Sequence, residues 1–341
     1  MEIKQPFFSV IVPTTGGRLE NLELVLTSLA QQIFPKQLFE VIVVNDGGEE
    51  EALDVVKKFR DSFTTLRYIY SDKFEPLAFD KTLDDIPIIE CKCWPNGRDE
   101  RGGIENVQPR NKGVFQACSD FFIFADSDII LSPTALACYF QDILHNPNRI
   151  ILGVYHWLYP MHITPNDVIT RFDDIIEEHL AKKLLTEIEP EGKQTHNICR
   201  DMRMKDFDEF TPDQTFSKPG HVNVALACYS GNICWPRTIF EDIGGFTPYL
   251  AAGAHEDGFS GITAYRAGHA ISYDNRIIGG HLYHPRDVKW VEWLKWERGE
   301  IDWFNEQHAD FEEMAGIIEA TEEEKKRLGV GDWKEKGKLG W

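Results

Sequence analysis

The chain has 341 residues, and 36 Lys and Arg against 56 Asp and Glu give it a formal net charge of −20 at pH 7. So acidic a surface repels the nucleic-acid backbone and anionic lipid, and neither is expected as a general partner. No apolar run approaches the ~20 residues that span a bilayer. The length suits one large α/β domain or two tightly joined lobes.

The seven cysteines stand at irregular spacings, and Cys91 and Cys93 form a C-x-C pair, which is not the usual zinc spacing. The N-terminal stretch MEIKQPFFSVIVPTT lacks the long apolar segment and the cleavage site of a secretory signal. We therefore expect reduced thiols and a cytoplasmic location.

Apolar, β-branched runs alternate with helical patterns over residues 7–70. Strands are expected at 7–13, 40–44 and 66–70, and helices at 21–32 and 49–62. This β-α-β-α-β order predicts a parallel, doubly wound sheet with right-handed crossovers.

The pattern continues after an irregular stretch, 71–109, which is typical of an insertion or a long loop. Helices are expected at 111–118 and 132–144, and strands at 120–125 and 150–155. Ser132 is the expected N-cap of the second helix, with Pro133 in its first turn. From about residue 156 the chain becomes amphipathic and then polar, and regular patterns return only between 221 and 283.

Two carboxylate features directly follow expected strands. Asp46 follows EVIVVN, and Asp126-Ser127-Asp128 follows the strand DFFIFA. Ligands of open parallel sheets bind beyond the carboxyl ends of the strands. There Asp46 can accept hydrogen bonds from a base such as uracil, although N-D-G-G also makes an ordinary turn. The D-x-D pair offers hard oxygen ligands to Mg²⁺ or Mn²⁺, and one carboxylate can reach a ribose.

Two further features lie late in the chain. Gly244-Gly245-Phe246 precedes Glu256-Asp257, at an expected helix start where a carboxylate is stabilised as the anion and suits a general base. A simple helix cap is the structural alternative. The segment GHLYHPR at 280–286 offers an imidazole that can complete a Mn²⁺ shell and an arginine that can pair with a diphosphate.

In this order the motifs resemble those of family 2 glycosyltransferases and their GT-A-fold relatives. The resemblance covers roughly 7–285 and rests on FFSVIVPTTGG, EVIVVNDGG, PRNKG at 109–113, DSD, GGF, ED and GHLY. It implies an α/β, Rossmann-like, doubly wound and mostly parallel sheet. Residues 1–150 would form the nucleotide-sugar-binding half, 151–285 the acceptor-binding and catalytic half of the same domain, and 286–341 a helical C-terminal extension.

The resemblance also implies roles for the matching residues. Asp257 would be the catalytic base, with Glu256 beside it. The metal would be held by Asp126, Asp128 and His281, with His284 as the second choice of histidine. The donor would contact Pro13, Thr14, Thr15, Asp46, Arg110, Asn111, Asp126, Ser127 and Arg286.

The expected activity is metal-dependent transfer of a sugar from a nucleotide-diphosphate sugar onto a saccharide or another hydroxyl acceptor. UDP is the favoured nucleotide. Mn²⁺ or Mg²⁺ would stabilise the leaving diphosphate, and in-line attack by the acceptor would invert the anomeric carbon. The alternatives are a retaining enzyme of the same fold and a catalytically silent carbohydrate- or partner-binding module. A sugar-nucleotide pyrophosphorylase is a third, but the turn TTGGRLENL lacks the lysine of its phosphate loop.

The acidic tail carries Trp290, Trp293 and Trp296, which recur every three residues. They are typical either of a helix that packs on its own domain or of an interface helix for carbohydrate, a partner or the membrane surface. Lys and Arg are too few there for a strongly basic membrane face, so any membrane contact is expected to be peripheral.

Overall fold

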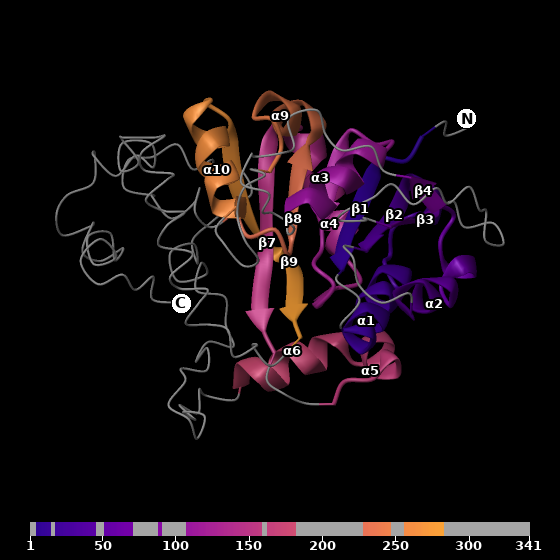
Figure 1. Ribbon diagram of the computed structural model, residues 1–341. Helices are drawn as coiled ribbons and strands as arrows, with labels where there is room; N and C mark the ends of the chain where they lie inside the picture. The colour runs from indigo at the N-terminus through magenta and orange to yellow at the C-terminus, as the bar shows by residue number, and fades with distance from the viewer. Residues whose placement is uncertain are drawn as a thin grey trace, which may run out of the picture.

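The molecule is built on one sheet, seen in a computed structural model that describes residues 5–14, 18–45, 51–70, 88–90, 107–158, 162–181, 228–246 and 256–282. The described strands form a nine-stranded sheet in the order β4-β3-β2-β1-β5-β8-β7-β9-β6 (Figure 1). No helix in these ranges is long and apolar enough to cross a membrane.

The first part of the sheet is parallel throughout. Its strands are β1 (Phe8–Thr14), β2 (Phe39–Asn45), β3 (Leu66–Tyr70), β4 (Ile88–Glu90) and β5 (Phe121–Phe124). Pairing runs from β4 through β3, β2 and β1 to β5, so these strands end at one edge of the sheet. The predicted doubly wound, mostly parallel sheet is confirmed, but β4 lies inside the stretch that we expected to be a loop.

The second part of the sheet is mixed. It comprises β6 (Ile129–Leu131), β7 (Arg149–Trp157), β8 (Ile233–Pro236) and β9 (Ala270–His281). β8 runs antiparallel to β5 and β7, whereas β7 and β9 are parallel and β6 pairs antiparallel with β9. The parallel pair β7 and β9 therefore ends at the same edge as β5, and β6 begins close to that edge.

Helices cover both faces of the sheet because successive strand residues point to opposite sides. Val10 and Val12 of β1 belong to one core, which includes residues of α1 (Leu19–Ala30), α2 (Glu51–Lys57) and α4 (Ala135–His145). Ile11 belongs to the other core, with residues of α3 (Val107–Gln116), α9 (Arg237–Asp242) and α10 (Glu256–Arg266). Short 3₁₀ turns at Lys36–Leu38 and Arg60–Ser62 precede β2 and β3.

Gly113 sets how closely α3 approaches the sheet. A Cβ at this position would lie 2.4 Å from Cγ2 of Ile11 and 3.3 Å from Cγ2 of Val44. Only a residue without a side chain allows that approach. The glycine therefore fixes the preceding turn of α3, which carries Arg110 and Asn111, near the carboxyl ends of β1 and β2.

The predicted N-cap of the helix at 132–144 is wrong. Helix α4 begins at Ala135, and Ser132 still belongs to the sheet edge, where its N–H donates to the Ile278 carbonyl at 2.8 Å. Gln32 takes over the capping function: its Oε1 accepts the N–H of Leu136 at 3.0 Å, and its Nε2 donates to the Ser132 carbonyl at 2.8 Å. A buried residue 104 positions away in sequence thus replaces the local cap.

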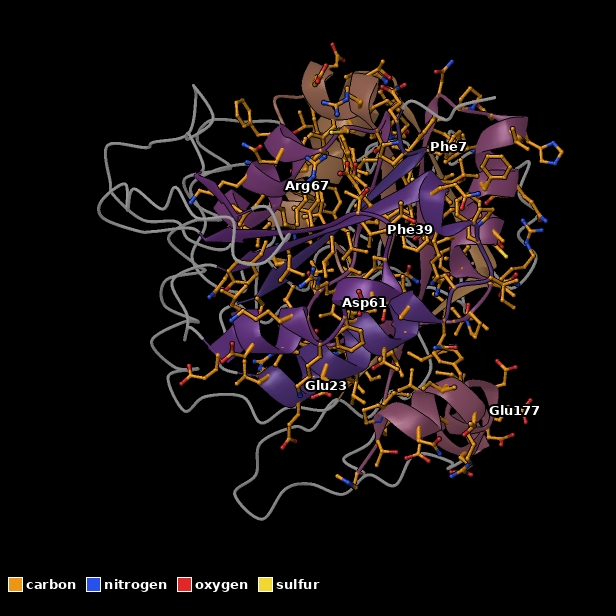
Figure 2. The ribbon with its side chains drawn as sticks, turned by 90° about the vertical axis from the view of Figure 1, so that its right-hand side faces the viewer. Phe7, Glu23, Phe39, Asp61, Arg67 and Glu177 are labelled. Atoms are coloured by element: carbon orange, nitrogen blue, oxygen red, sulfur yellow. The ribbon has the colours of Figure 1, made fainter. Side chains whose placement is uncertain are left out.

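Two short helices follow β7: α6 (Phe172–Ala181) lies below the carboxyl ends of β7 and β9, and α5 (Pro165–Thr170) lies beneath α1 (Figure 1). Thr164 and Asp167 form a capping box at the start of α5. On α6, Phe172 and Ile175 are buried, whereas Glu177 is exposed and points away from the sheet (Figure 2). Apolar residues of both helices join the core that contains α1.

A buried pair of carboxyl groups lies beside a bulge in β9. The register jumps from Gly153 opposite Asp274 to Val154 opposite Ile278. In the bulge, Arg276 donates to Asp274 at 2.6 Å and to Asp142 of α4 at 2.9 Å. Burial raises the pKa of Asp142 to about 7, and the Asp274 carboxylate adds to this rise.

This raised pKa predicts a pH-dependent stability. An unfolded Asp titrates near pH 4, so between about pH 4 and pH 7 the folded chain holds a proton that the unfolded chain has lost. The contribution of Asp142 to the free energy of unfolding is therefore complete below pH 4 and is lost as pH rises to about 7. We expect Asp142→Asn to gain stability relative to wild type between pH 5 and pH 8, measured by urea denaturation. If the difference in the free energy of unfolding between the variant and wild type is the same at pH 5 and pH 8, the raised pKa of Asp142 is contradicted.

Candidate active site

The D-x-D motif lies where β5 ends and β6 begins. Asp126 comes two residues after β5, and its Oδ1 lies 2.5 Å from Nη2 of Arg110. Arg110 belongs to α3 and is 7% exposed. The guanidinium also lies over the Phe246 ring, 5.9 Å from its centroid. The carboxylate of Asp126 is thus paired with a cation from α3.

Asp128 and His281 are brought together by the pairing of β6 with β9. Ile129 is the register partner of His281, and the N–H of Leu282 donates to the Asp128 carbonyl at 2.8 Å. As a result, Nε2 of His281 lies 3.4 Å from Oδ1 of Asp128. Both residues are buried: His281 is 3% exposed and Asp128 is 6% exposed.

Two residues that the sequence did not point to complete the surroundings of this pair. Arg18 donates from Nη1 to the second oxygen of Asp128, Oδ2, at 2.7 Å. Trp157 ends β7 beside His281, and the two rings meet edge to face with their centroids 3.8 Å apart. Trp157 therefore restricts the orientation of the imidazole, and Arg18 offsets the charge of Asp128.

These side chains fit a divalent cation that binds two protein ligands. A carboxylate oxygen and an imidazole nitrogen 3.4 Å apart are close enough to bind one ion. In the described residues no group of three or more His, Cys, Asp and Glu side chains forms a metal site. Further ligands would have to come from water or from phosphate oxygens, as is usual for Mg²⁺.

Asn111 connects α3 to the G-G-F turn. Its Nδ2 donates to the Phe246 carbonyl at 2.9 Å, and its Oδ1 accepts the Phe246 N–H at 3.1 Å. Gly245 has φ +80°, which favours glycine, and a Cβ there would lie 2.9 Å from the Asn111 Oδ1. The Phe246 ring packs edge to face on Phe124, the last residue of β5, with ring centroids 4.9 Å apart. The turn is thus fixed above the strand that leads to Asp126.

Asp257 lies in the first turn of α10. Its Oδ1 accepts the N–H of Gly258 at 2.7 Å, and its Oδ2 accepts the N–H of Ser230 at 2.9 Å. These donors and the helix N-terminus favour the carboxylate anion. Ser230 precedes β8, and the start of β8 pairs with the end of β5. The Asp257 carboxylate is therefore held at the same edge of the sheet as the D-x-D motif, the edge where the parallel strands end.

For the other candidate residues, the structure gives only the position in the fold or no description. Pro13 and Thr14 end β1, and Thr14 is buried opposite Asn45, the residue before Asp46. Ser127 is half-buried, and Glu256 opens α10. The remaining candidates lie outside the described residues: Thr15, Asp46, His284 and Arg286. The roles assigned to all of these residues stay predictions.

Known proteins share parts of this sequence. A family model described as glycosyl transferase family 2 matches residues 9–75. The chain is 31% identical over 129 residues to the poly(ribitol-phosphate) beta-N-acetylglucosaminyltransferase TarS of Staphylococcus aureus, covering 38% of this chain and 17% of TarS. It is 22% identical over 276 residues to the hyaluronan synthase of Pasteurella multocida, covering 80% of this chain and 24% of the synthase. The chain thus spans less than a quarter of either relative.

The fold also matches a solved structure over almost its whole length. The crystal structure of S. aureus TarS 1-349 in complex with UDP-GlcNAc superposes with a TM-score of 0.56 at 17% identity. The match covers 97% of this chain and 76% of that chain. This likeness shows that the chain shares the GT-A fold of TarS, and the family match over residues 9–75 supports the predicted resemblance to glycosyltransferase family 2.

Proposed function

We propose that the protein transfers a sugar from a UDP-linked donor to an acceptor hydroxyl, with the help of a divalent cation and with inversion at the anomeric carbon. The pairing of Asp128 with His281, at 3.4 Å, carries the proposal. A carboxylate and an imidazole converge there beyond the end of β5, where open parallel sheets bind their ligands. The structurally similar TarS was crystallised in complex with UDP-GlcNAc, which supports a uridine donor.

The proposed donor site uses charges that the fold holds in fixed positions. Asp128 and His281 would bind Mn²⁺ or Mg²⁺, which supplies the Lewis acidity that stabilises a leaving diphosphate. Asp126 pairs with Arg110, and we assign it to accept hydrogen bonds from the ribose hydroxyls. Because Asp128 and His281 are buried, bulk water competes little with these two side chains for the metal ion.

Asp257 is the group that we assign to the acceptor. As an anion held by two backbone N–H groups, it can accept the proton of the acceptor hydroxyl while keeping its orientation. The hydroxyl oxygen then attacks the anomeric carbon, and the bond to the diphosphate breaks on the opposite face. The Asn111 hydrogen bonds to Phe246 fix the start of the segment that leads to Asp257.

Donor binding can be tested without knowing the acceptor. Thermal unfolding is measured with UDP-GlcNAc, UDP-glucose, UDP-galactose and GDP-mannose, each with Mn²⁺ and with EDTA. A ligand at 100 times its Kd stabilises a fold by about 2.7 kcal/mol. We expect a UDP-sugar to raise the Tm in Mn²⁺ and to have a much smaller effect in EDTA. The proposal fails if no nucleotide sugar changes the Tm, or if the change is the same without metal.

A separate prediction concerns the nucleotide base. Asp46 directly follows β2, whose last residue, Asn45, pairs with Thr14 at the carboxyl edge of the sheet. We expect Asp46→Ala to reduce the preference for UDP over GDP and ADP, measured as a ratio of Kd values by calorimetry. Asp54→Ala, which removes an exposed carboxylate of α2, serves as the control. An unchanged ratio would make Asp46 a turn residue.

A further inference from the structure

Arg18 occupies a position that local forces disfavour. It is the N-cap residue of α1, and its side chain makes no capping hydrogen bond there. N-cap positions favour Ser, Thr, Asp and Asn, and the positive end of the helix dipole repels a cation. The helix itself therefore gives no reason for an arginine here, and the partner of its guanidinium has to explain it.

That partner is Asp128, whose two oxygens face different groups. Oδ1 lies 3.4 Å from Nε2 of His281, and Oδ2 accepts from Nη1 of Arg18 at 2.7 Å. The exposure of the two groups differs, because the His281 side chain is 4% exposed and that of Arg18 is 42% exposed. Arg18 thus reaches Asp128 from the solvent side and can leave without disturbing the core.

Such an ion pair is weak enough to be displaced. Half-exposed arginine side chains gain little from one carboxylate because solvent screens the attraction and the side chain loses freedom. A divalent cation carries twice the charge and prefers hard oxygen ligands. When it binds Asp128 at Oδ1, it competes for the negative charge of the carboxylate to which Arg18 donates through Oδ2.

We propose that Arg18 competes with the divalent cation for Asp128 in the donor-free protein and, once displaced, binds the diphosphate of the donor. The inference rests on the proposed function, because it takes Asp128 as a metal ligand. A guanidinium within hydrogen-bonding distance of a metal ligand is close enough to reach phosphate oxygens bound to that metal. Arginine suits this role because its planar fork donates two parallel hydrogen bonds to a phosphate.

The exchange couples the two ligands. Metal binding releases the cation that the diphosphate needs, and a bound diphosphate keeps Arg18 away from Asp128. By linkage, each ligand then raises the affinity for the other by the same factor. Arg18 thereby disfavours metal binding in the absence of a nucleotide and favours the metal and nucleotide together.

The test measures the two affinities separately, because their expected changes have opposite signs. Binding of Mn²⁺ alone is followed by electron paramagnetic resonance, and binding of UDP in saturating Mn²⁺ by calorimetry. We expect Arg18→Gln to bind Mn²⁺ about two- to fivefold tighter, since a weak competing cation is gone. We expect the same variant to bind UDP about tenfold or more weakly, since a charged hydrogen-bond donor is lost. General damage to the site would weaken both.

Matched variants complete the experiment. Arg18→Lys should recover only part of the UDP affinity, because lysine keeps the charge but not the planar fork of arginine. Lys57→Gln removes a cation of similar exposure, 45%, from a 2.8 Å pair on α2, and should change neither affinity. If wild type binds Mn²⁺ through Asp128 and Arg18→Gln binds it equally or more weakly, the competition is refuted and the metal site stands. If wild type binds no Mn²⁺, or Asp128→Ala binds it as well as wild type does, the proposed metal site fails together with the competition.

Discussion

Replacing Asp257 by Asn is expected to lower the rate of sugar transfer by about 10²- to 10⁴-fold, the usual cost of losing a general base. The side chain keeps its size, but the amide nitrogen cannot accept a proton. UDP affinity in Mn²⁺ should hardly change, because we assign Asp257 to the acceptor and not to the nucleotide. A decrease in kcat with an unchanged Kd for UDP is therefore the expected signature.

The surroundings of Asp257 define the controls for this variant. Its oxygens accept the N–H groups of Ser230 and Gly258, and an amide NH₂ would face one of these donors. The variant should therefore lose about 1 kcal/mol of stability, which a melting curve will show. Asp242→Asn, which alters an exposed carboxylate that is 2.7 Å from His269, controls for the loss of charge.

The stereochemistry of the product gives an independent check. An inverting enzyme turns an α-linked donor into a β-linked product, which the coupling constant of the anomeric proton reveals by NMR. An α-linked product would exclude the single displacement for which Asp257 is assigned as base. Such a result would leave the fold and the proposed metal site untouched.

The parallel strands β1, β2, β3 and β5 could be predicted from sequence to within one residue at each end. β3 covers the predicted 66–70, and β2 extends the predicted 40–44 by one residue at each end. Buried parallel strands are continuous apolar runs, so their own composition marks them. The edge strand β4 was missed because a short strand in an irregular stretch has no comparable apolar pattern.

Contacts between distant segments were beyond the reach of sequence patterns. The start of α4 was misplaced because its cap comes from Gln32, and Gln32 carries no local signal for that role. Arg18 and Asp128 are 110 residues apart, and α1 comes close to β6 because β1 pairs with β5, which shortly precedes β6 in the chain. The sequence could name chemically suitable residue types at strand ends, such as Asp128 and His281, but the register that joins them had to come from the structure.

Asn111 has a structural role that the resemblance did not indicate. The resemblance assigns it to the donor, whereas its described hydrogen bonds go to the backbone of Phe246. The same helix turn carries Arg110, which pairs with Asp126. One turn of α3 thus contacts both Asp126 and the G-G-F turn.

The second large effect is expected from Asp128→Ala. The variant removes the carboxylate that faces both His281 and Arg18, so a divalent cation keeps only the imidazole of the pair. Loss of a group that merely supports a metal ligand costs about 10- to 100-fold in metal affinity, and loss of a ligand should cost at least as much. We expect UDP affinity in Mn²⁺ to fall by a similar factor, measured by calorimetry.

The decisive comparison is the same titration in EDTA. Without metal, wild type has a carboxylate and a paired arginine near the phosphates, whereas the variant has an arginine released from that pair. The variant should therefore bind UDP at least as tightly as wild type in EDTA, although it binds UDP much more weakly in Mn²⁺. Asp54→Ala, which removes an exposed carboxylate paired with Lys57, should behave as wild type in both buffers. Equal affinities of wild type in Mn²⁺ and EDTA would rule out a metal-dependent donor site, because the reversal depends on the cation bound by Asp128.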